Sequence, residues 1–417
     1  MNGPVAPLGW WPVRGPGFRD SWSRAGVGVA LLVAFLLLAG CSVGSIRPSP
    51  PQPGRTSVGS PLVVLPAQLI GNFLVIEAKW DRFGPYRFLI DTGSSVTLVS
   101  PALVQRYPGR GVVGAGAPPL RVRGAEGRVV ELPRGSLRRL ELGDARFEDV
   151  EVLLYDCAPL SAHLGVAIDG VLGFPLFRDT LLTLDYPGQQ VVLRPTASAA
   201  PMPGTTLAFD DARKTPLISL RLGERSLLAL IDSGSDAAFS LNPVGTGSRF
   251  LAGPTPGAMV GTIAGEREQR VGRLEGALAV GDQVFENPVV DLTDELSAVG
   301  GGALRHFAVT FDQQRDQVTF FREGRGPIAV PPLRSAGVSF TKTPAYWRVA
   351  AVVPGSPAQT AGIERGDLVI RINGEPMAKW DLRRYEQLVA TTEEVAFTFL
   401  AGNRENEKKV KTFALVP

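Results

Sequence analysis

Two stretches of the sequence place carboxylates and hydroxyls at the same spacing. An Asp, a hydroxyl residue, a Gly and a second hydroxyl residue follow an apolar segment twice, as Asp91, Thr92, Gly93 and Ser94 and as Asp232, Ser233, Gly234 and Ser235. Glycine permits a tight turn that a β-carbon would obstruct, so we expect each Asp at the end of a strand, held by the turn. The alternative is a glycine turn in which the Asp only caps backbone amides.

A pair of such carboxylates is suited to the hydrolysis of amides. If the two segments face each other, Asp91 and Asp232 cannot both ionise cheaply, and the pair keeps one proton from acidic to neutral pH. The ionised member can activate water while the protonated member polarises a carbonyl group. This chemistry needs no metal, cofactor or histidine. The chain has only His163 and His306, without a Cys or His cluster around either, and Cys157 is expected to be a small, partly buried residue.

The surrounding sequence predicts a mainly β fold with an internal repeat. From Leu62, short apolar or alternating runs are separated by Gly, Pro and Asp, and no long helical pattern occurs before residues 381–390. Segments beginning at Tyr86, Arg138 and Asp169 match segments beginning at Leu227, Gly276 and Ser297 in the same order. We therefore expect two similar lobes, residues 62–195 and 205–323, joined by a linker at 196–204.

These motifs resemble the active-site sequences of aspartic proteases. The lobes have the short length of retroviral-type (retropepsin) subunits but are fused in tandem, as pepsin lobes are, which implies a pseudo-two-fold pair. Gly170–Gly173 resembles the hydrophobic-hydrophobic-Gly element that this family packs beneath each catalytic loop, and the counterpart at Ala298 is weaker. The resemblance implies that Asp91 and Asp232 are the catalytic pair and that Gly93 and Gly234 shape the two loops. It also implies that the hydroxyls of Thr92 and Ser233 bond the backbone of the opposite lobe. The hydroxyls of Ser94 and Ser235 would bond the outer carboxylate oxygens.

The same family closes glycine-tipped hairpins, called flaps, over its substrate. The candidates are residues 121–132, with Gly124 and Gly127 at the tip, and the matching region of the second lobe, with Gly261 and Gly265. Neither segment contains the Tyr of pepsin flaps. Asp236 stands where the first lobe has Ser95, and we expect it to point to solvent. If it faced the pair instead, it would raise the proton affinity of the pair.

A different module follows a second linker at residues 324–334. Within residues 335–417, Pro354–Glu375 resembles the middle of a PDZ domain. The resemblance implies binding of extended peptides by strand addition, with a terminal carboxylate held on backbone amides. The candidate carboxylate loop comprises Gly337, Val338, Ser339 and Phe340, although it lacks the usual Gly-hydrophobic-Gly-hydrophobic form. The alternative is a PDZ fold that serves only as a spacer.

The N-terminus predicts export and lipid anchoring. Three arginines precede the apolar run Val27–Gly40, which is shorter than the roughly 20 residues of a membrane span. The run ends in Leu38-Ala39-Gly40-Cys41, which resembles the lipobox of bacterial lipoproteins. We expect a signal over residues 1–40, a lipidated Cys41, a Ser/Pro/Gly-rich tether over 41–61, and sorting to the outer membrane, facing the periplasm. The alternative is an ordinary signal peptide with an incidental cysteine.

The sequence thus predicts a lipid-anchored aspartic endopeptidase with a PDZ domain. Its expected partners are peptide or protein substrates, including C-terminal tails at the PDZ domain. A net charge of +3 without a long basic run argues against nucleic acid. We expect one chain to supply both halves of the site, as a monomeric pseudo-dimer. Two alternatives stay open, a catalytically inactive scaffold that binds peptides through its PDZ domain, and lobes that pair between two chains.

Overall fold

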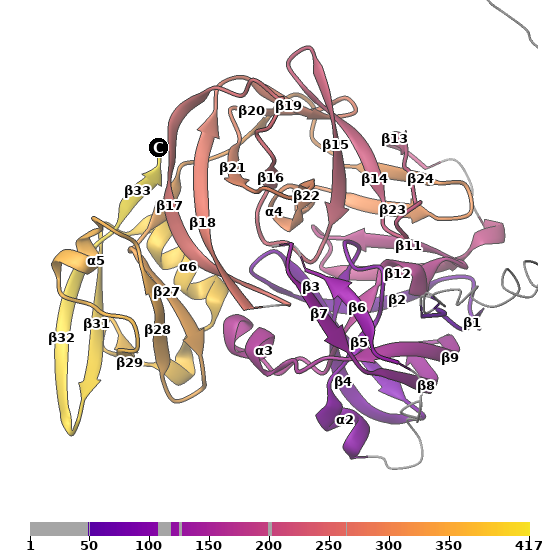
Figure 1. The fold of residues 1–417 in the computed structure, drawn as a ribbon, viewed down its shortest axis with the longest axis horizontal. Helices are drawn as coiled ribbons and strands as arrows, with labels where there is room; N and C mark the ends of the chain where they lie inside the picture. The colour runs from indigo at the N-terminus through magenta and orange to yellow at the C-terminus, as the bar shows by residue number, and fades with distance from the viewer. Residues whose placement is uncertain (1–48, 50, 107–117, 125–126, 199–201, 264) are drawn as a thin grey trace, which may run out of the picture. The chain divides into compact units, whose positions relative to one another are not determined.

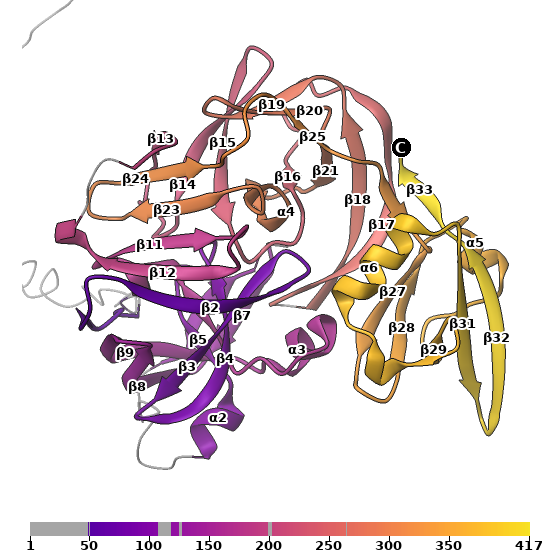
Figure 2. The same cartoon turned by 180° about the vertical axis from the view of Figure 1, so that it is seen from behind.

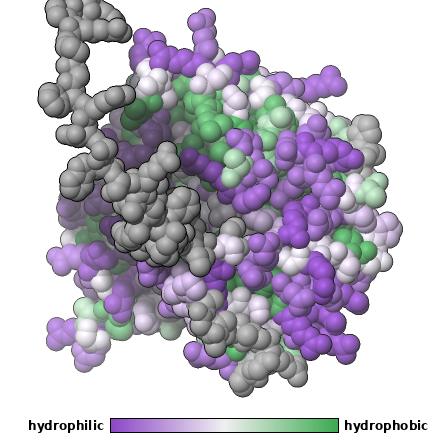
Figure 3. All heavy atoms as spheres, turned by 45° about the vertical axis from the view of Figure 1, so that its right-hand side comes forward, coloured by the Kyte–Doolittle hydropathy of each residue, from purple (hydrophilic) through white to green (hydrophobic). Residues whose placement is uncertain are grey.

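The computed structural model describes residues 49, 51–106, 118–124, 127–198, 202–263 and 265–417. From residue 50 onward the chain forms one unit, which is mainly β, as predicted (Figure 1). The predicted signal and Cys41 lie outside the described residues. Within the part of the chain that is described, no helix is long and apolar enough to cross a membrane. On the face drawn in Figure 3, hydrophilic side chains predominate and apolar ones gather in patches.

The described residues of the first lobe form twelve strands and short helices. Its elements are β1 (Arg55–Val58), β2 (Val63–Ile70), β3 (Phe73–Trp80), β4 (Phe83–Asp91), β5 (Leu98–Val99), α2 (Pro101–Gln105), β6 (Leu120–Arg123), β7 (Val129–Leu132), β8 (Arg134–Leu142), β9 (Ala145–Leu154), α3 (Ala158–Leu164), β10 (Gly170–Gly173), the 3-10 helix η1 (Phe174–Phe177), β11 (Thr180–Asp185) and β12 (Gln190–Pro195). Strand β1 lies within the predicted tether and pairs with β9, so the ordered lobe begins earlier than the expected boundary at residue 62.

The second lobe repeats this plan after the short 3-10 helix η2 (Thr196–Ser198). Its elements are β13 (Thr205–Ala208), β14 (Leu217–Leu222), β15 (Arg225–Asp232), β16 (Phe239–Leu241), β17 (Phe250–Thr262), β18 (Gly265–Leu274), β19 (Ala277–Val280), β20 (Gln283–Glu286), β21 (Val289–Leu292), β22 (Ser297–Gly300), α4 (Gly301–Leu304), β23 (Ala308–Asp312), β24 (Gln317–Phe321) and β25 (Ile328–Ala329). Strand β25 pairs with β20, so the predicted linker at 324–334 partly belongs to the sheet of this lobe.

The two lobes share a sheet and a core. Hairpin β11–β12 of the first lobe and hairpin β23–β24 of the second lie side by side, with β11 antiparallel to β23. Thr183 pairs with Thr310, and their hydroxyl oxygens are 2.8 Å apart. Each is the counterpart of the other in the repeat, as expected where a pseudo-two-fold axis crosses a sheet. Beneath the sheet Phe174 of the first lobe packs edge-on against Phe209 and Phe311 of the second.

The C-terminal module has a sheet and a core of its own (Figure 2). Its elements are β26 (Leu333–Ser335), β27 (Val338–Lys342), β28 (Trp347–Val352), α5 (Pro357–Thr360), β29 (Leu368–Ile372), β30 (Glu375–Pro376), the 3-10 helix η3 (Met377–Lys379), α6 (Leu382–Thr391), β31 (Glu394–Ala401), β32 (Arg404–Lys411) and β33 (Phe413–Val416). The strand order β27-β28-β29-β31-β32 leaves β27 at an edge. Asp381 caps α6 by accepting a 2.7 Å hydrogen bond from Arg384 N.

Candidate active site

Strands β4 and β15 end at Asp91 and Asp232, which the sheets place in equivalent positions. Strand β10 runs parallel to β4 with Gly173 opposite Asp91, and β22 runs parallel to β15 with Gly300 opposite Asp232. A Cβ on either glycine would overlap a carbonyl oxygen of the adjacent Asp loop. The Gly element that looked weaker in the second lobe therefore packs beneath its loop in the same way as the first.

The two carboxyl groups lie against each other across the lobes. They share a hydrogen bond, and both residues are partly buried. Asp91 Oδ1 accepts a hydrogen bond from Gly93 N at 2.8 Å, and Asp232 Oδ1 accepts one from Gly234 N at 2.9 Å. A Cβ on Gly93 would overlap the Asp232 carboxylate, and one on Gly234 would overlap that of Asp91. The absence of a side chain on each glycine therefore leaves space for the opposite carboxylate.

Thr92 and Ser233 connect the two loops through four reciprocal hydrogen bonds. Thr92 Oγ1 donates to Ile231 O at 2.7 Å and accepts from Ser233 N at 3.0 Å. Ser233 Oγ donates to Ile90 O at 2.9 Å and accepts from Thr92 N at 3.0 Å. Both side chains are completely buried. This cross-linked pair fixes the separation of the two Asp loops from beneath.

The second hydroxyl of each motif lies elsewhere than the resemblance implied. Ser94 Oγ donates to Val96 O at 2.8 Å, because the turn directs this side chain back into its own loop. The prediction that Ser94 bonds the outer oxygen of Asp91 through its hydroxyl is therefore wrong. In the second loop, the described residues show no hydrogen bond from the Ser235 hydroxyl to Asp232, whereas Ser235 N donates to Asp232 O at 3.2 Å.

The environment of the pair favours its protonated form. Burial raises the pKa of Asp91 well above its usual range, and the negative charge of Asp232 and the hydrogen bond that protonated Asp91 donates to Asp232 raise it further. The backbone N–H groups of Gly93 and Ser94 act in the opposite direction. Burial also raises the pKa of Asp232, while hydrogen bonds from Asp91 and Gly234 N lower it. The pair is therefore expected to keep a proton well above the pH at which a free Asp loses it.

This shift predicts how stability depends on pH. Between the unfolded pKa of an Asp, about 4, and the raised folded value, folding takes up a proton, so the contribution of Asp91 to stability falls as pH rises. Asp91→Asn removes this dependence. We expect urea unfolding to show the variant gaining stability relative to the wild type as pH rises above about 4, with little difference near pH 3. Exposed Asp316 provides the control substitution Asp316→Asn. Parallel pH curves for wild type and Asp91→Asn would contradict the shift.

Asp236 bonds to a turn of the first lobe. Its carboxylate accepts a 2.8 Å hydrogen bond from Asn72 N, and its carbonyl oxygen accepts one of the same length from Asn72 Nδ2. Asn72 lies in the turn between β2 and β3, and its carbonyl oxygen occupies the space that a Cβ on Gly301 would need. Asn72 was not foreseen as a site residue, because a turn residue carries no sign of a partner 164 positions away.

The first glycine-tipped segment is a hairpin formed by β6 and β7. Gly124 N donates to Arg128 O at 2.8 Å and Gly127 N donates to Gly124 O at 3.0 Å, so both glycines lie at the turn. Gly127 has a positive φ of 78°. Arg123 Nη2 lies 2.7 Å from Glu295 Oε1 in the second lobe. The hairpin of the first lobe thus reaches across to the second.

The matching hairpin of the second lobe is longer and reaches across to the first. Strand β17 contains Gly261 near its end, and β18 begins at Gly265, whose φ is 133°. Thr262 Oγ1 donates to Gly265 O at 3.0 Å across the tip. A Cβ on Gly261 would lie 2.5 Å from Cδ2 of His163 in α3, so the imidazole packs directly on this backbone.

The candidate carboxylate loop of the C-terminal module is largely a strand. Only Gly337, with a φ of 79°, precedes β27, whereas Val338, Ser339 and Phe340 belong to it. The Phe340 ring packs against Trp347 and Tyr385 in the core of the module. The predicted loop is therefore wrong beyond Gly337, because alternating buried residues draw the segment into the sheet.

The described part of the chain contains neither a metal cluster nor an activated thiol. No set of three or more His, Cys, Asp and Glu there could hold a metal ion. Cys157 is buried, and its burial, with smaller effects from the charges of Asp156 and Asp169, raises the pKa of its thiol to about 12. It is therefore a thiol and not a thiolate at neutral pH.

Comparison with known families identifies two parts of the chain. Residues 77–176 match the family model described as an aspartyl protease, and this span runs from β3 to η1 and contains Asp91. Residues 348–400 match a model of the PDZ domain, from β28 to β31. The search of curated proteins finds no match.

Proposed function

We propose that this protein, which joins an aspartyl protease domain to a PDZ domain, is an aspartic endopeptidase whose catalytic pair is Asp91 and Asp232. The observation that carries the proposal is the hydrogen-bonded carboxyl pair at the ends of β4 and β15, held by reciprocal bonds between Thr92 and Ser233. Cleavage of an extended peptide by the wild-type protein, lost when either Asp is replaced, is the experiment that tests it.

The reaction follows from the shared proton. The ionised carboxylate takes a proton from water as the water oxygen bonds to the peptide carbonyl carbon, while the protonated carboxyl group donates to the carbonyl oxygen. As the tetrahedral intermediate collapses, the carboxyl group that took the water proton donates it to the leaving nitrogen and the C–N bond breaks. The other carboxylate takes a proton from one hydroxyl of the intermediate, which re-forms the carbonyl group and restores the pair. Because the pair titrates as a unit, which Asp starts with the proton depends on the bound substrate. The substrate would lie extended between the pair and the two hairpins.

The rival function is a scaffold that binds peptides without cutting them. The observation that favours it is that each hairpin is held to the opposite lobe, through Arg123 or through the packing of Gly261 on His163. In that case the PDZ domain alone would act on peptides. New peptide termini distinguish the two functions, because a scaffold would bind peptides without producing any.

Anchoring by lipid at Cys41, in the outer membrane and facing the periplasm, belongs to the same proposal. The support is the sequence Leu38-Ala39-Gly40-Cys41 after a short apolar run. We expect the full-length protein to sediment with membranes after expression in a Gram-negative bacterium, and Cys41→Ser to abolish lipid labelling and mature processing before Cys41. Mass spectrometry of the mature N-terminus checks this. An unmodified Cys41 in the wild type would leave an ordinary export signal as the explanation.

A further inference from the structure

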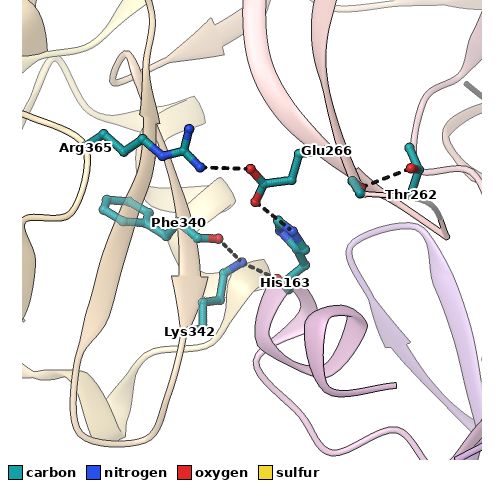
Figure 4. A network of polar contacts seen from close by, with 7 residues as sticks. His163, Thr262, Glu266, Phe340, Lys342 and Arg365 are labelled. Atoms are coloured by element: carbon teal, nitrogen blue, oxygen red, sulfur yellow. Dashed lines mark hydrogen bonds and ion pairs between the residues drawn. The ribbon is translucent and has the colours of Figure 1, made fainter. Parts of the chain in front are cut away.

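One carboxylate connects three parts of the molecule. Glu266, next to the tip of the second-lobe hairpin, lies 3.2 Å from Nη2 of Arg365 and 3.6 Å from Nε2 of His163 (Figure 4). Arg365 belongs to the PDZ domain, in the loop between α5 and β29, and His163 belongs to α3 of the first lobe. The tip of this hairpin is therefore held by the other lobe and by the PDZ domain together.

The same α3 is bound to the edge strand of the PDZ domain. Lys342, at the end of β27, donates a hydrogen bond from Nζ to the carbonyl oxygen of His163. Lys342 is buried, and a buried ammonium group is costly unless it is partnered. A Cβ on Gly165, which caps α3, would lie 3.1 Å from Lys342 Cδ. This end of α3 is thus packed closely against β27.

This contact lies on the side of β27 where a peptide strand would add. Among the described residues, the sheet pairs β27 only with β28, and Figures 1 and 2 both show α3 on the side of β27 opposite to β28. Extended peptides extend a sheet at such an open edge. A peptide that filled the edge along its whole length would therefore compete with the α3 contact at Lys342.

The base of the second-lobe hairpin is attached to the same module. Arg273, on β18, donates from Nη1 to Val330 O at 3.1 Å and from Nη2 to Pro331 O at 3.0 Å, just before β26 begins. A further bond joins it to Pro417 O. In contrast, the polar contact of the first hairpin, Arg123 to Glu295, stays within the two lobes. The PDZ domain thus holds one of the two hairpins, at both its tip and its base.

We propose that the PDZ domain is a latch on the second-lobe hairpin, and that an extended peptide with a free C-terminal carboxylate, bound along β27, opens the latch and raises the rate of peptide hydrolysis. The inference rests on the proposed function. The bound peptide displaces the end of α3 from Lys342, which moves His163 away from Gly261 and Glu266. Glu266 then loses its contact with His163 and keeps the one with Arg365, and the hairpin can lift to admit substrate.

The test uses the full chain and three variants. Arg365→Ala and Glu266→Gln remove the ion pair between Glu266 and Arg365, which is the latch contact. Arg371→Ala is the control, because it removes another partly exposed Arg of the PDZ domain, which lies 3.5 Å from Glu405. Hydrolysis is followed with a quenched fluorescent peptide whose C-terminus is amidated. The added effector is a decapeptide pool randomised at its last four positions, supplied as free acids or as amides.

The free-acid pool is expected to increase the rate of hydrolysis about fivefold or more for the wild type and for Arg371→Ala, which is the lower end of usual coupling between sites. The amide pool is expected to leave the rate unchanged. The two latch variants should have a raised basal rate and a reduced response. Unchanged basal rates in both latch variants, or equal responses to free acids and amides, would overturn the latch.

A second readout separates this inference from the proposed function. Hydrogen exchange of residues 250–274 is expected to be faster in Arg365→Ala than in Arg371→Ala, whether or not the protein cuts peptides. Faster exchange without hydrolysis in any variant would retain the latch and reject the endopeptidase. Equal exchange in the two variants, with hydrolysis intact, would reject the latch alone.

Discussion

Asp91→Asn and Asp232→Asn are each expected to lower kcat/KM for peptide hydrolysis by about 10²–10⁴-fold, the usual contribution of positioned acid–base groups. An amide can neither take a proton from water nor donate one as a carboxylic acid does. Each substitution therefore removes one half of the shared-proton pair, and the remaining Asp cannot perform both roles. Steady-state kinetics on the soluble wild type and the two variants measure the loss.

The fold should survive these substitutions, because Asn has nearly the shape of Asp and the bonds of Thr92 and Ser233 do not involve the carboxylates. Asp316→Asn, at an exposed turn, is the matched control and should keep full activity. A mixture of the Asp91→Asn and Asp232→Asn proteins should stay inactive, since one chain supplies the whole pair. Recovery of activity on mixing would mean that lobes pair between chains, and activity within about tenfold of wild type in either variant would remove the pair from catalysis.

Thr92→Val is expected to cost about 2–6 kcal/mol of unfolding free energy, the sum of two buried groups that each lose a partner at about 1–3 kcal/mol. Valine has nearly the shape of threonine but leaves Ile231 O without its donor and Ser233 N without its acceptor. Because these bonds also set the distance between the Asp loops, hydrolysis should fall more steeply than the folded fraction. Urea unfolding and kcat at the same temperature measure the two effects.

Thr183→Val is the matched control for this substitution. Its hydroxyl also bridges the lobes, but it bonds a single hydroxyl, that of Thr310, at 2.8 Å in the shared sheet. We expect a cost of about 1 kcal/mol there and little change in hydrolysis. A cost for Thr92→Val no larger than that for Thr183→Val would show that the reciprocal bonds do not hold the Asp loops.

The parts of the site that could be predicted depend on local sequence. An apolar strand followed by Asp and Gly predicts a strand end and a tight turn, and β4 and β15 do end at Asp91 and Asp232. The hairpin turn at Gly124 and Gly127 follows from the same logic, because a positive φ favours glycine. The repeat predicted two similar lobes, since matching strands bury matching faces and can pack about a pseudo-two-fold axis.

The remaining features depend on partners that are distant in the chain. The bonds between Asn72 and Asp236 and between Lys342 and His163 join segments with no common pattern. Strand β1 was not predicted because it pairs with β9 through backbone hydrogen bonds. Almost any segment can form such bonds, so its Ser- and Pro-rich surroundings gave no sign of a strand. The carboxylate loop was misplaced because Gly337 is the one residue of the predicted segment whose backbone needs a loop conformation. The residues that follow it alternate between buried and partly exposed positions, as in a strand.

The central claim is tested most directly by looking for cleavage itself. A soluble form that begins at residue 50, and so keeps β1, would be incubated with a diverse peptide library from about pH 4 to 8, the range in which a coupled carboxyl pair can hold one proton. Mass spectrometry then identifies new peptide termini. We predict new termini with the wild type and none with Asp91→Asn or Asp232→Asn. A folded wild-type protein that binds library peptides and produces no new terminus at any pH would contradict the claim.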